Sequence, residues 1–162
     1  MGHTVNSIII NAPYTNVFDT SNDIARWSDL FGGEYIKSEV LEVKGNEITF
    51  RLTDDDNKSW VSKRWLFKEH KLAYASRWDP MFPFKFMKIV WLYTELEGGV
   101  KMTWIQDFEM DAKFTKFTDE QICGFINEHS TKNMKIFKDV IEKESSQAKD
   151  KVSCKTKKCC CE

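Results

Sequence analysis

The segment VKMTWIQDFEM, Val100–Met110, has the clearest two-residue alternation in the chain and decides the fold. One face carries Val100, Met102, Trp104, Gln106, Phe108 and Met110, and the other carries Lys101, Thr103, Ile105, Asp107 and Glu109. Such alternation predicts a half-buried antiparallel strand. Gln106 is the single polar residue on the inward face. A buried primary amide needs a partner, so Gln106 either is a core glutamine satisfied by backbone or serves water or a ligand.

The same period extends upstream from Val100 and predicts about six strands between Tyr35 and Met110, cut by turn signals such as Lys44-Gly45-Asn46 and Gly98-Gly99. Thr4–Ile10 reads as a further strand. Two short helices should follow it: one opened by Pro13 with Asn11 as its cap, and a second over Asp23–Phe31. Thr118–Ile141 predicts one long helix, and Thr118 with Gln121 resembles a capping box.

This order predicts an α+β fold in which a curved antiparallel seven-stranded sheet wraps a long C-terminal helix. A cavity can remain between the helix and the sheet where the sheet curls away. Aromatic residues are 14% of the chain, which suits either a packed core or a cavity lined for a flat ligand.

Length and composition limit the remaining possibilities. The 162 residues predict one domain, 1–145, followed by a Lys/Cys-rich tail, 146–162, with too few apolar residues to fold. A net charge of −1 gives no basic footprint for nucleic acid. No apolar run approaches the ~18 residues of a membrane span, and KKCCCE fits no lipidation motif. The adjacent cysteines and the lack of a signal peptide favour the cytoplasm.

The chemistry-bearing residues give weak signals individually. His3, His70 and His129 are scattered without metal-ligand spacing, and no phosphate loop or dinucleotide fingerprint occurs, so neither a metal nor a cofactor is expected. His129 and Asn133 continue the apolar stripe of the long helix. They indicate either a polar spot in the cavity or a satisfied core histidine.

The stretch SWVSKRW, Ser59–Trp65, puts an arginine between two tryptophans. Trp60, Ser62 and Arg64 share one face of this predicted strand. Neither face is purely apolar, so alternation alone leaves open whether Arg64 points inward or into solvent.

Six motifs together resemble a known family: NSIIINAP (6–13), TSNDIARW (20–27), WVSKR (60–64), PFKFM (83–87), WIQDFEM (104–110) and NMKIF (133–137). In this order they are similar to tetracenomycin-type aromatase/cyclases, single-domain polyketide cyclases of the helix-grip (START/Bet v 1-like) superfamily. The resemblance covers Thr4 to Glu144.

The resemblance implies a cytoplasmic, monomeric enzyme of type II aromatic polyketide assembly. Such an enzyme takes a linear poly-β-ketone on acyl carrier protein, directs aldol closure of the first ring between carbons 9 and 14, and aromatises it by dehydration to yield a small aromatic polyketide. The alternative from another class is a non-catalytic carrier of a hydrophobic lipid, quinone or pigment, because the fold serves both roles.

The resemblance also implies site residues. It turns Arg64 inward to polarise a ketone and makes Tyr35 the second catalytic residue. The substrate-binding set is Gln106, Asn133, His129, Ser62, Trp27, Phe31, Trp60, Met87, Trp91 and Trp104. The chain departs from the family in four places: His129 replaces a small hydroxyl residue, Lys63 replaces a histidine, Trp65 is bulkier, and the loop Trp78–Phe82 is longer.

Overall fold

A computed structural model describes residues 1–77 and 82–157, with the backbone alone for 149–157. The elements are β1 (Gly2–Ile10), α1 (Tyr14–Ser21), η1 (Ile24–Arg26), α2 (Trp27–Leu30), β2 (Tyr35–Lys44), β3 (Glu47–Asp54), β4 (Ser59–Phe67), η2 (Lys68–His70), β5 (Leu72–Arg77), β6 (Phe84–Leu96), β7 (Gly99–Met110) and α3 (Asp119–Lys157).

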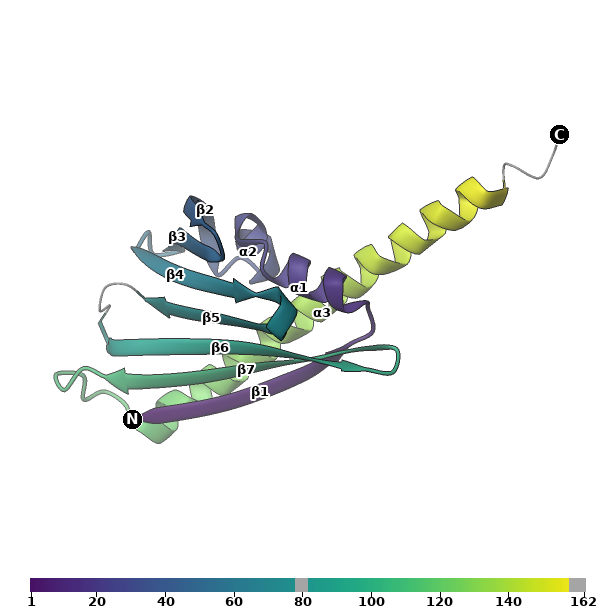
Figure 1. Ribbon diagram of the computed structural model, residues 1–162. Helices are drawn as coiled ribbons and strands as arrows, with labels where there is room; N and C mark the ends of the chain where they lie inside the picture. Colours follow the sequence, from purple (N-terminus) through teal and green to yellow (C-terminus); the bar gives the residue numbers. More distant parts are fainter. Residues whose placement is uncertain (78–81, 158–162) are drawn as a thin grey trace.

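The strands form one antiparallel sheet in the order β1-β7-β6-β5-β4-β3-β2. The sheet curves around the first half of α3, while α2 packs beside β2 and α1 lies next to α3 (Figure 1). The predicted architecture is therefore confirmed: seven antiparallel strands, a long C-terminal helix, and short helices after the first strand.

Strand β7 has the register that its alternation predicted. Val100, Met102, Trp104, Gln106 and Phe108 are buried, whereas the side chains between them are exposed or half-buried. Antiparallel pairing with β6 sets Trp104 opposite Trp91. Their rings stack at 4.4 Å with an interplanar angle of 6°. Both tryptophans belong to the main core and also line the cavity described below.

Helix α3 begins with the predicted capping box. The backbone N–H of Thr118 donates to Gln121 Oε1 at 3.0 Å, and the N–H of Gln121 donates to Thr118 Oγ1 at 3.2 Å. Two otherwise unpaired donors of the first turn are thereby satisfied. Phe137 packs edge-on against both Trp91 and Trp104 from this helix.

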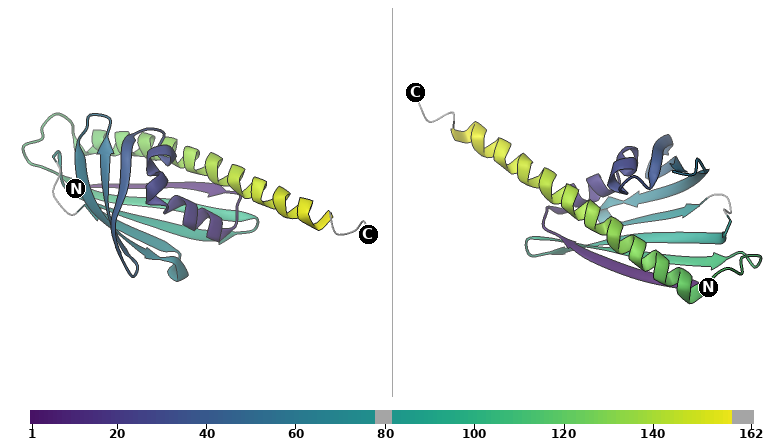
Figure 2. Two further views of the ribbon diagram at one scale, coloured as in Figure 1. Left: turned by 90° about the horizontal axis from the view of Figure 1, so that it is seen from above. Right: turned by 180° about the vertical axis from the view of Figure 1, so that it is seen from behind.

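The helix does not end at the predicted Ile141. Its backbone continues through Lys157 and projects beyond the sheet (Figure 2). Residues 158–162 lie outside the described residues, and the division into a domain and a disordered tail stays a prediction. No helix in the described part of the chain is long and apolar enough to cross a membrane.

The short helices differ from the prediction in detail. The N-terminal boundary of α1 is Pro13, whose ring fixes φ at −57°, and no side chain caps the helix. Asn11 is not the cap; its backbone N–H instead donates to Glu142 Oε1 at 2.7 Å. The predicted helix over Asp23–Phe31 is split into η1 and α2.

Candidate active site

A cavity of about 370 Å³ lies between the concave face of the sheet and α3. Its size is typical of small-molecule sites. All twelve residues that the sequence predicted for the site line it: Arg64, Tyr35, Gln106, Asn133, His129, Ser62, Trp27, Phe31, Trp60, Met87, Trp91 and Trp104. They come from α2 and the residue that follows it, from α3, and from strands β2, β4, β6 and β7, so only the folded chain brings them together.

Arg64 points inward and is 1% exposed. Its Nε donates to Asn22 Oδ1 at 2.8 Å, and its guanidinium carbon lies 4.1 Å from the centre of the Trp91 ring and 5.3 Å from that of Trp27. Burial lowers the pKa of Arg64 to about 10, and the nearby Tyr93 partly offsets this effect. At neutral pH the side chain is still cationic, and among the described residues aromatic faces rather than a carboxylate surround it.

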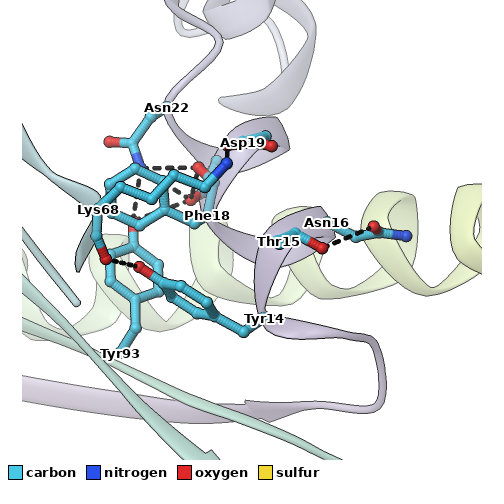
Figure 3. Close-up of polar contacts among 9 residues, drawn as sticks. Tyr14, Thr15, Asn16, Phe18, Asp19, Asn22, Lys68 and Tyr93 are labelled. Atoms are coloured by element: carbon cyan, nitrogen blue, oxygen red, sulfur yellow. Dashed lines mark hydrogen bonds and ion pairs between the residues drawn. The ribbon is translucent and has the colours of Figure 1, made fainter. Parts of the chain in front are cut away.

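A polar group behind Arg64 holds its partner Asn22 in place. Tyr93 Oη lies 2.9 Å from Ser21 Oγ and accepts a hydrogen bond from Asn22 Nδ2 at 3.0 Å. Asn22 Nδ2 also donates to the carbonyl of Phe18 at 2.8 Å (Figure 3). With its amide nitrogen so engaged, Asn22 must present its oxygen to Arg64. Asn22 lies in the motif TSNDIARW, but nothing in that motif predicts this role.

Gln106 is buried, as its position on the inward face of β7 predicted. Its Nε2 donates to Ser130 Oγ on α3 at 2.7 Å. The partner is therefore a side chain of the facing helix, not the backbone. This bond links the sheet to α3 across the cavity and leaves the second N–H and the carbonyl oxygen of Gln106 available.

A second polar cluster lies on the α3 side of the cavity. Glu34 Oε2 lies 2.7 Å from His129 Nε2 and accepts from Asn133 Nδ2 at 3.1 Å. The bond to Glu34 raises the pKa of His129 above its ordinary value. The side chain of His129 is 52% exposed, so His129 is not a core histidine. Burial raises the pKa of Tyr35 well above its usual range, and the neighbouring Glu34 adds to this increase.

The turn before β2 places Glu34. Gly32 and Gly33 have φ of +61° and +84°, a left-handed conformation that costs little only for glycine. A Cβ on Gly32 would lie 2.7 Å from Ile136 Cδ1, so the turn also packs closely on α3. Glu34 was not predicted from the sequence, because its side chain reaches the cavity from a turn, where strand alternation gives no signal.

Arg77, at the end of β5, is a second cavity arginine that the sequence analysis missed. Its guanidinium carbon lies 5.2 Å from the Trp60 ring centre and 5.4 Å from that of Phe84. Burial lowers its pKa. Ala73, Ala75 and Arg77 alternate on the inward side of β5, and this pattern was the available signal.

Two departures from the family face away from the cavity. Lys63 Nζ and Trp65 Nε1 both donate to the carboxylate of Glu47, at 2.6 and 2.9 Å. Neither residue lines the cavity. Of the longer loop Trp78–Phe82, residues 78–81 lie outside the described residues.

The cavity wall concentrates hydrogen-bond donors without a protein partner. Within residues 1–77 and 82–148, five buried side-chain polar atoms lack one: Thr4 Oγ1, Arg64 Nη2, Arg77 Nη1, Trp91 Nε1 and Trp104 Nε1. The last four belong to cavity residues, and all four are donors. Buried polar groups normally find partners. These four atoms are inaccessible to solvent and lie behind the cavity surface, so a ligand acceptor reaches them only if the surrounding side chains move. Groups of three or more potential metal ligands do not occur in the described part of the chain.

Comparison with known proteins gives a consistent result. Residues 1–142 match a family model described as "Polyketide cyclase / dehydrase and lipid transport". A Streptomyces cyaneus protein named "Putative polyketide cyclase" is 42% identical over 149 residues, which cover 89% of this chain and 96% of that protein.

Solved structures show the same fold at low identity. The aromatase/cyclase Zhui from Streptomyces sp. R1128 has a TM-score of 0.71 at 18% identity, covering 90% of this chain and 93% of that one. A START superfamily protein from Mycobacterium smegmatis has a TM-score of 0.64 at 9% identity, covering 91% of this chain and 99% of that one. With the family match over nearly the whole folded region, the chain belongs to the polyketide cyclase/dehydrase and lipid transport family and has its START-like, helix-grip fold.

Proposed function

We propose that this protein is an aromatase/cyclase of type II aromatic polyketide assembly. It directs aldol closure of the first ring of an acyl-carrier-bound poly-β-ketone, between carbons 9 and 14, and the dehydration that aromatises it. The observation that carries the proposal is Arg64, a buried cation that packs on Trp91 and Trp27 in the wall of an aromatic cavity. A poly-β-ketone offers such a site flat enol segments, many oxygen acceptors and an enolate charge.

The main task of the cavity is to fold a flexible chain. A methylene between two ketones is already acidic, so bringing one pair of carbons together is the harder step. Trp27, Phe31, Trp60, Trp91 and Trp104 form walls against which conjugated segments can lie flat. Binding in the cavity removes the conformational freedom of the polyketide chain, and the conformation in which the chain is held then determines which carbons join.

Arg64 supplies the electrostatic part of the mechanism. When the enolate carbon attacks a ketone, one C–C bond forms and negative charge moves to the ketone oxygen. The guanidinium stabilises this charge, and one such preorganised donor contributes about 3 kcal/mol. Arg64 remains protonated at neutral pH and therefore acts as a charge and hydrogen-bond donor.

Tyr35, Gln106 and Asn133 complete the roles at this step. Tyr35 gives its phenolic proton to the new alkoxide, which is a stronger base than a phenolate even when the phenol has a raised pKa. Gln106 and Asn133 orient carbonyl and enol groups. Gln106 has one amide N–H engaged with Ser130 and keeps a second one for substrate.

The test is a product profile with a minimal polyketide synthase that makes an unreduced chain. The purified protein is added to this system, and isotopic labelling identifies the carbons joined in each product. We expect a scrambled set of shunt products to converge on one aromatic first ring. Closure at another position would overturn the proposed regiochemistry alone.

The carrier alternative predicts a different result. A carrier leaves the product distribution unchanged, and mass spectrometry of protein purified from lysate should then find a bound lipid, quinone or pigment. An unchanged distribution with such a ligand would overturn the cyclase proposal.

A further inference from the structure

Glu34 and His129 form a carboxylate–imidazole pair that the mechanism above does not use. The two side chains come from different elements, Glu34 from the turn before β2 and His129 from α3, and both line the cavity. Their 2.7 Å contact is the shorter of the two side-chain contacts that Glu34 Oε2 makes with α3.

The hydrogen bonds define which nitrogen of His129 carries hydrogen. Asn133 Nδ2 can only donate, and it donates to Glu34 Oε2 at 3.1 Å. A carboxylate can only accept, so His129 Nε2 carries a hydrogen when it bonds to Glu34. The 3.0 Å approach of Asn133 Nδ2 to His129 Nε2 is then a contact of two donors that share one acceptor. This arrangement leaves Nδ1 as the nitrogen that gains and loses a proton.

The charged and titratable groups around the pair come from three elements. Tyr35 and Arg77 flank Glu34 from β2 and β5, and Lys132 lies beside His129 on α3. Glu34 raises the pKa of His129 through its hydrogen bond and its charge, and Lys132 lowers it by a smaller amount. An imidazolium formed beside Glu34 is therefore stabilised, and the half-exposed ring can still exchange its proton with solvent.

We propose that His129, oriented by Glu34, carries the proton in the dehydration that follows ring closure. This inference rests on the proposed function and adds to it. Neutral Nδ1 removes a proton from the methylene next to the new carbinol, and the electrons of the C–H bond form an enolate. The imidazolium then gives that proton to the departing hydroxyl group, the C–O bond breaks, a C=C bond forms and water leaves. His129 ends neutral, so no other reactant is consumed.

Tyr35 is less suited to this second step. A phenol whose pKa lies well above its usual range can protonate an alkoxide, but it is a weak acid for assisting the departure of a hydroxyl group. The two proton transfers therefore fall to different residues. Glu34 is a positioning residue, because it acts through His129.

The first test needs no substrate. The chain contains 3 histidines, so their ring protons can be assigned by proton NMR with single His→Gln variants and then titrated. We expect Glu34→Gln to lower the pKa of His129, since it removes the charge that raises it. Asp107→Asn is the matched control, because Asp107 pairs with His3 at 2.7 Å; it should leave the His129 titration unchanged. A His129 pKa that Glu34→Gln does not lower would overturn the pair.

The second test measures how the product divides between ring-closed, still hydroxylated material and aromatised material. His129→Gln keeps a hydrogen-bonding side chain but carries no proton, so the ratio of aromatised to hydroxylated product should fall about 100-fold while the joined carbons stay the same. His70→Gln, on η2, is the control. In the wild type the ratio should rise with pH through the His129 pKa, and in Glu34→Gln the midpoint should be lower.

The outcomes separate the two proposals. If the wild type directs ring closure but His129→Gln aromatises equally well at every pH, the role of His129 is overturned and the cyclase remains. If the wild type leaves the product distribution unchanged, the proposed function fails and the dehydration role fails with it. The NMR titration still decides whether Glu34 and His129 are coupled.

Discussion

Arg64 is a charge in a place where charges are costly. Moving a cation out of water costs several kcal/mol even after relaxation. Part of this is offset by the Asn22 bond and by stacking on Trp91 and Trp27, since a desolvated cation–π contact is worth about 2 kcal/mol. No carboxylate within residues 1–77 and 82–148 neutralises it. Such a residue contributes more to binding than to stability.

Arg64→Met should therefore separate stability from function. The variant keeps a side chain of similar length and removes the desolvated charge, but it leaves Asn22 Oδ1 unpaired at a cost of about 1–3 kcal/mol. We expect the free energy of unfolding in urea to fall by no more than about 1 kcal/mol, or to rise. Arg51→Met, at an exposed position of β3, is the control. A loss above about 3 kcal/mol would instead give Arg64 a structural role.

Residue-level prediction from the sequence succeeded where a motif or an alternation identified the position. Alternation in β7 placed Gln106 inward, and the family resemblance placed Arg64. Alternation alone could not place Arg64, because both faces of β4 carry polar and aromatic residues. Arg77 and Glu34 were missed for different physical reasons. Arg77 is the last residue of a short strand whose other inward residues are two alanines, so the alternation there is weak. The position of Glu34 depends on a turn conformation, which strand alternation does not predict.

Among the elements, the turn between α2 and β2 has the most direct effect on the site. Its two glycines end α2, reverse the chain and bring Glu34 to α3. The N–H of Gly33 donates to the carbonyl of Ser28 at 3.2 Å, and the N–H of Gly32 to that of Asp29 at 3.1 Å. The position of Glu34 is thus fixed by the backbone.

Alanine substitutions in this turn should have unequal effects. At both positions the backbone is left-handed, so an added Cβ costs about 1–2 kcal/mol of stability. Gly32→Ala adds a contact with Ile136 Cδ1, whereas a Cβ on Gly33 has nothing within 4 Å. We expect Gly32→Ala to lower the urea midpoint more than Gly33→Ala and to change the His129 titration more strongly. Equal effects of both variants would show that the turn does not depend on its packing against α3.

The elements were predictable to the extent that their sequences repeat a period. The strands and the capping box of α3 follow from local patterns. The split of 23–31 into η1 and α2 does not, because it depends on how this segment packs over the sheet. The predicted C-terminal boundary of α3, Ile141, was also too early. No glycine or proline follows Ile141 to stop the helix, so the helix continues to Lys157.

In the whole molecule, α3 is held to the N-terminal helices well past the cavity. Asn16 Nδ2 donates to Ser145 Oγ at 3.0 Å, and Arg26 forms an ion pair with Glu144. Glu142 accepts the backbone N–H of Asn11. The predicted boundary after residue 145 stays a prediction, and Ser145 is the last residue of α3 in these three contacts.

Two truncations test that boundary. A chain ending at Ala148 keeps all three contacts, so its free energy of unfolding should match that of the full chain to within about 0.5 kcal/mol. A chain ending at Ile141 loses them and should be less stable by about 2 kcal/mol. Urea denaturation followed by tryptophan fluorescence measures both. If the chain ending at Ala148 is less stable than the full chain, the tail belongs to the folded domain.

The central claim, that an inward Arg64 directs cyclisation in this cavity, is tested most directly by one ratio. The wild type, Arg64→Met and Arg51→Met are each added to the minimal synthase, and the single first-ring product is measured against the shunt products. The account predicts that Arg64→Met lowers this ratio by about 100-fold, for a loss of about 3 kcal/mol at the transition state, while Arg51→Met equals the wild type. An Arg64→Met protein that is folded and keeps the wild-type ratio would contradict the account.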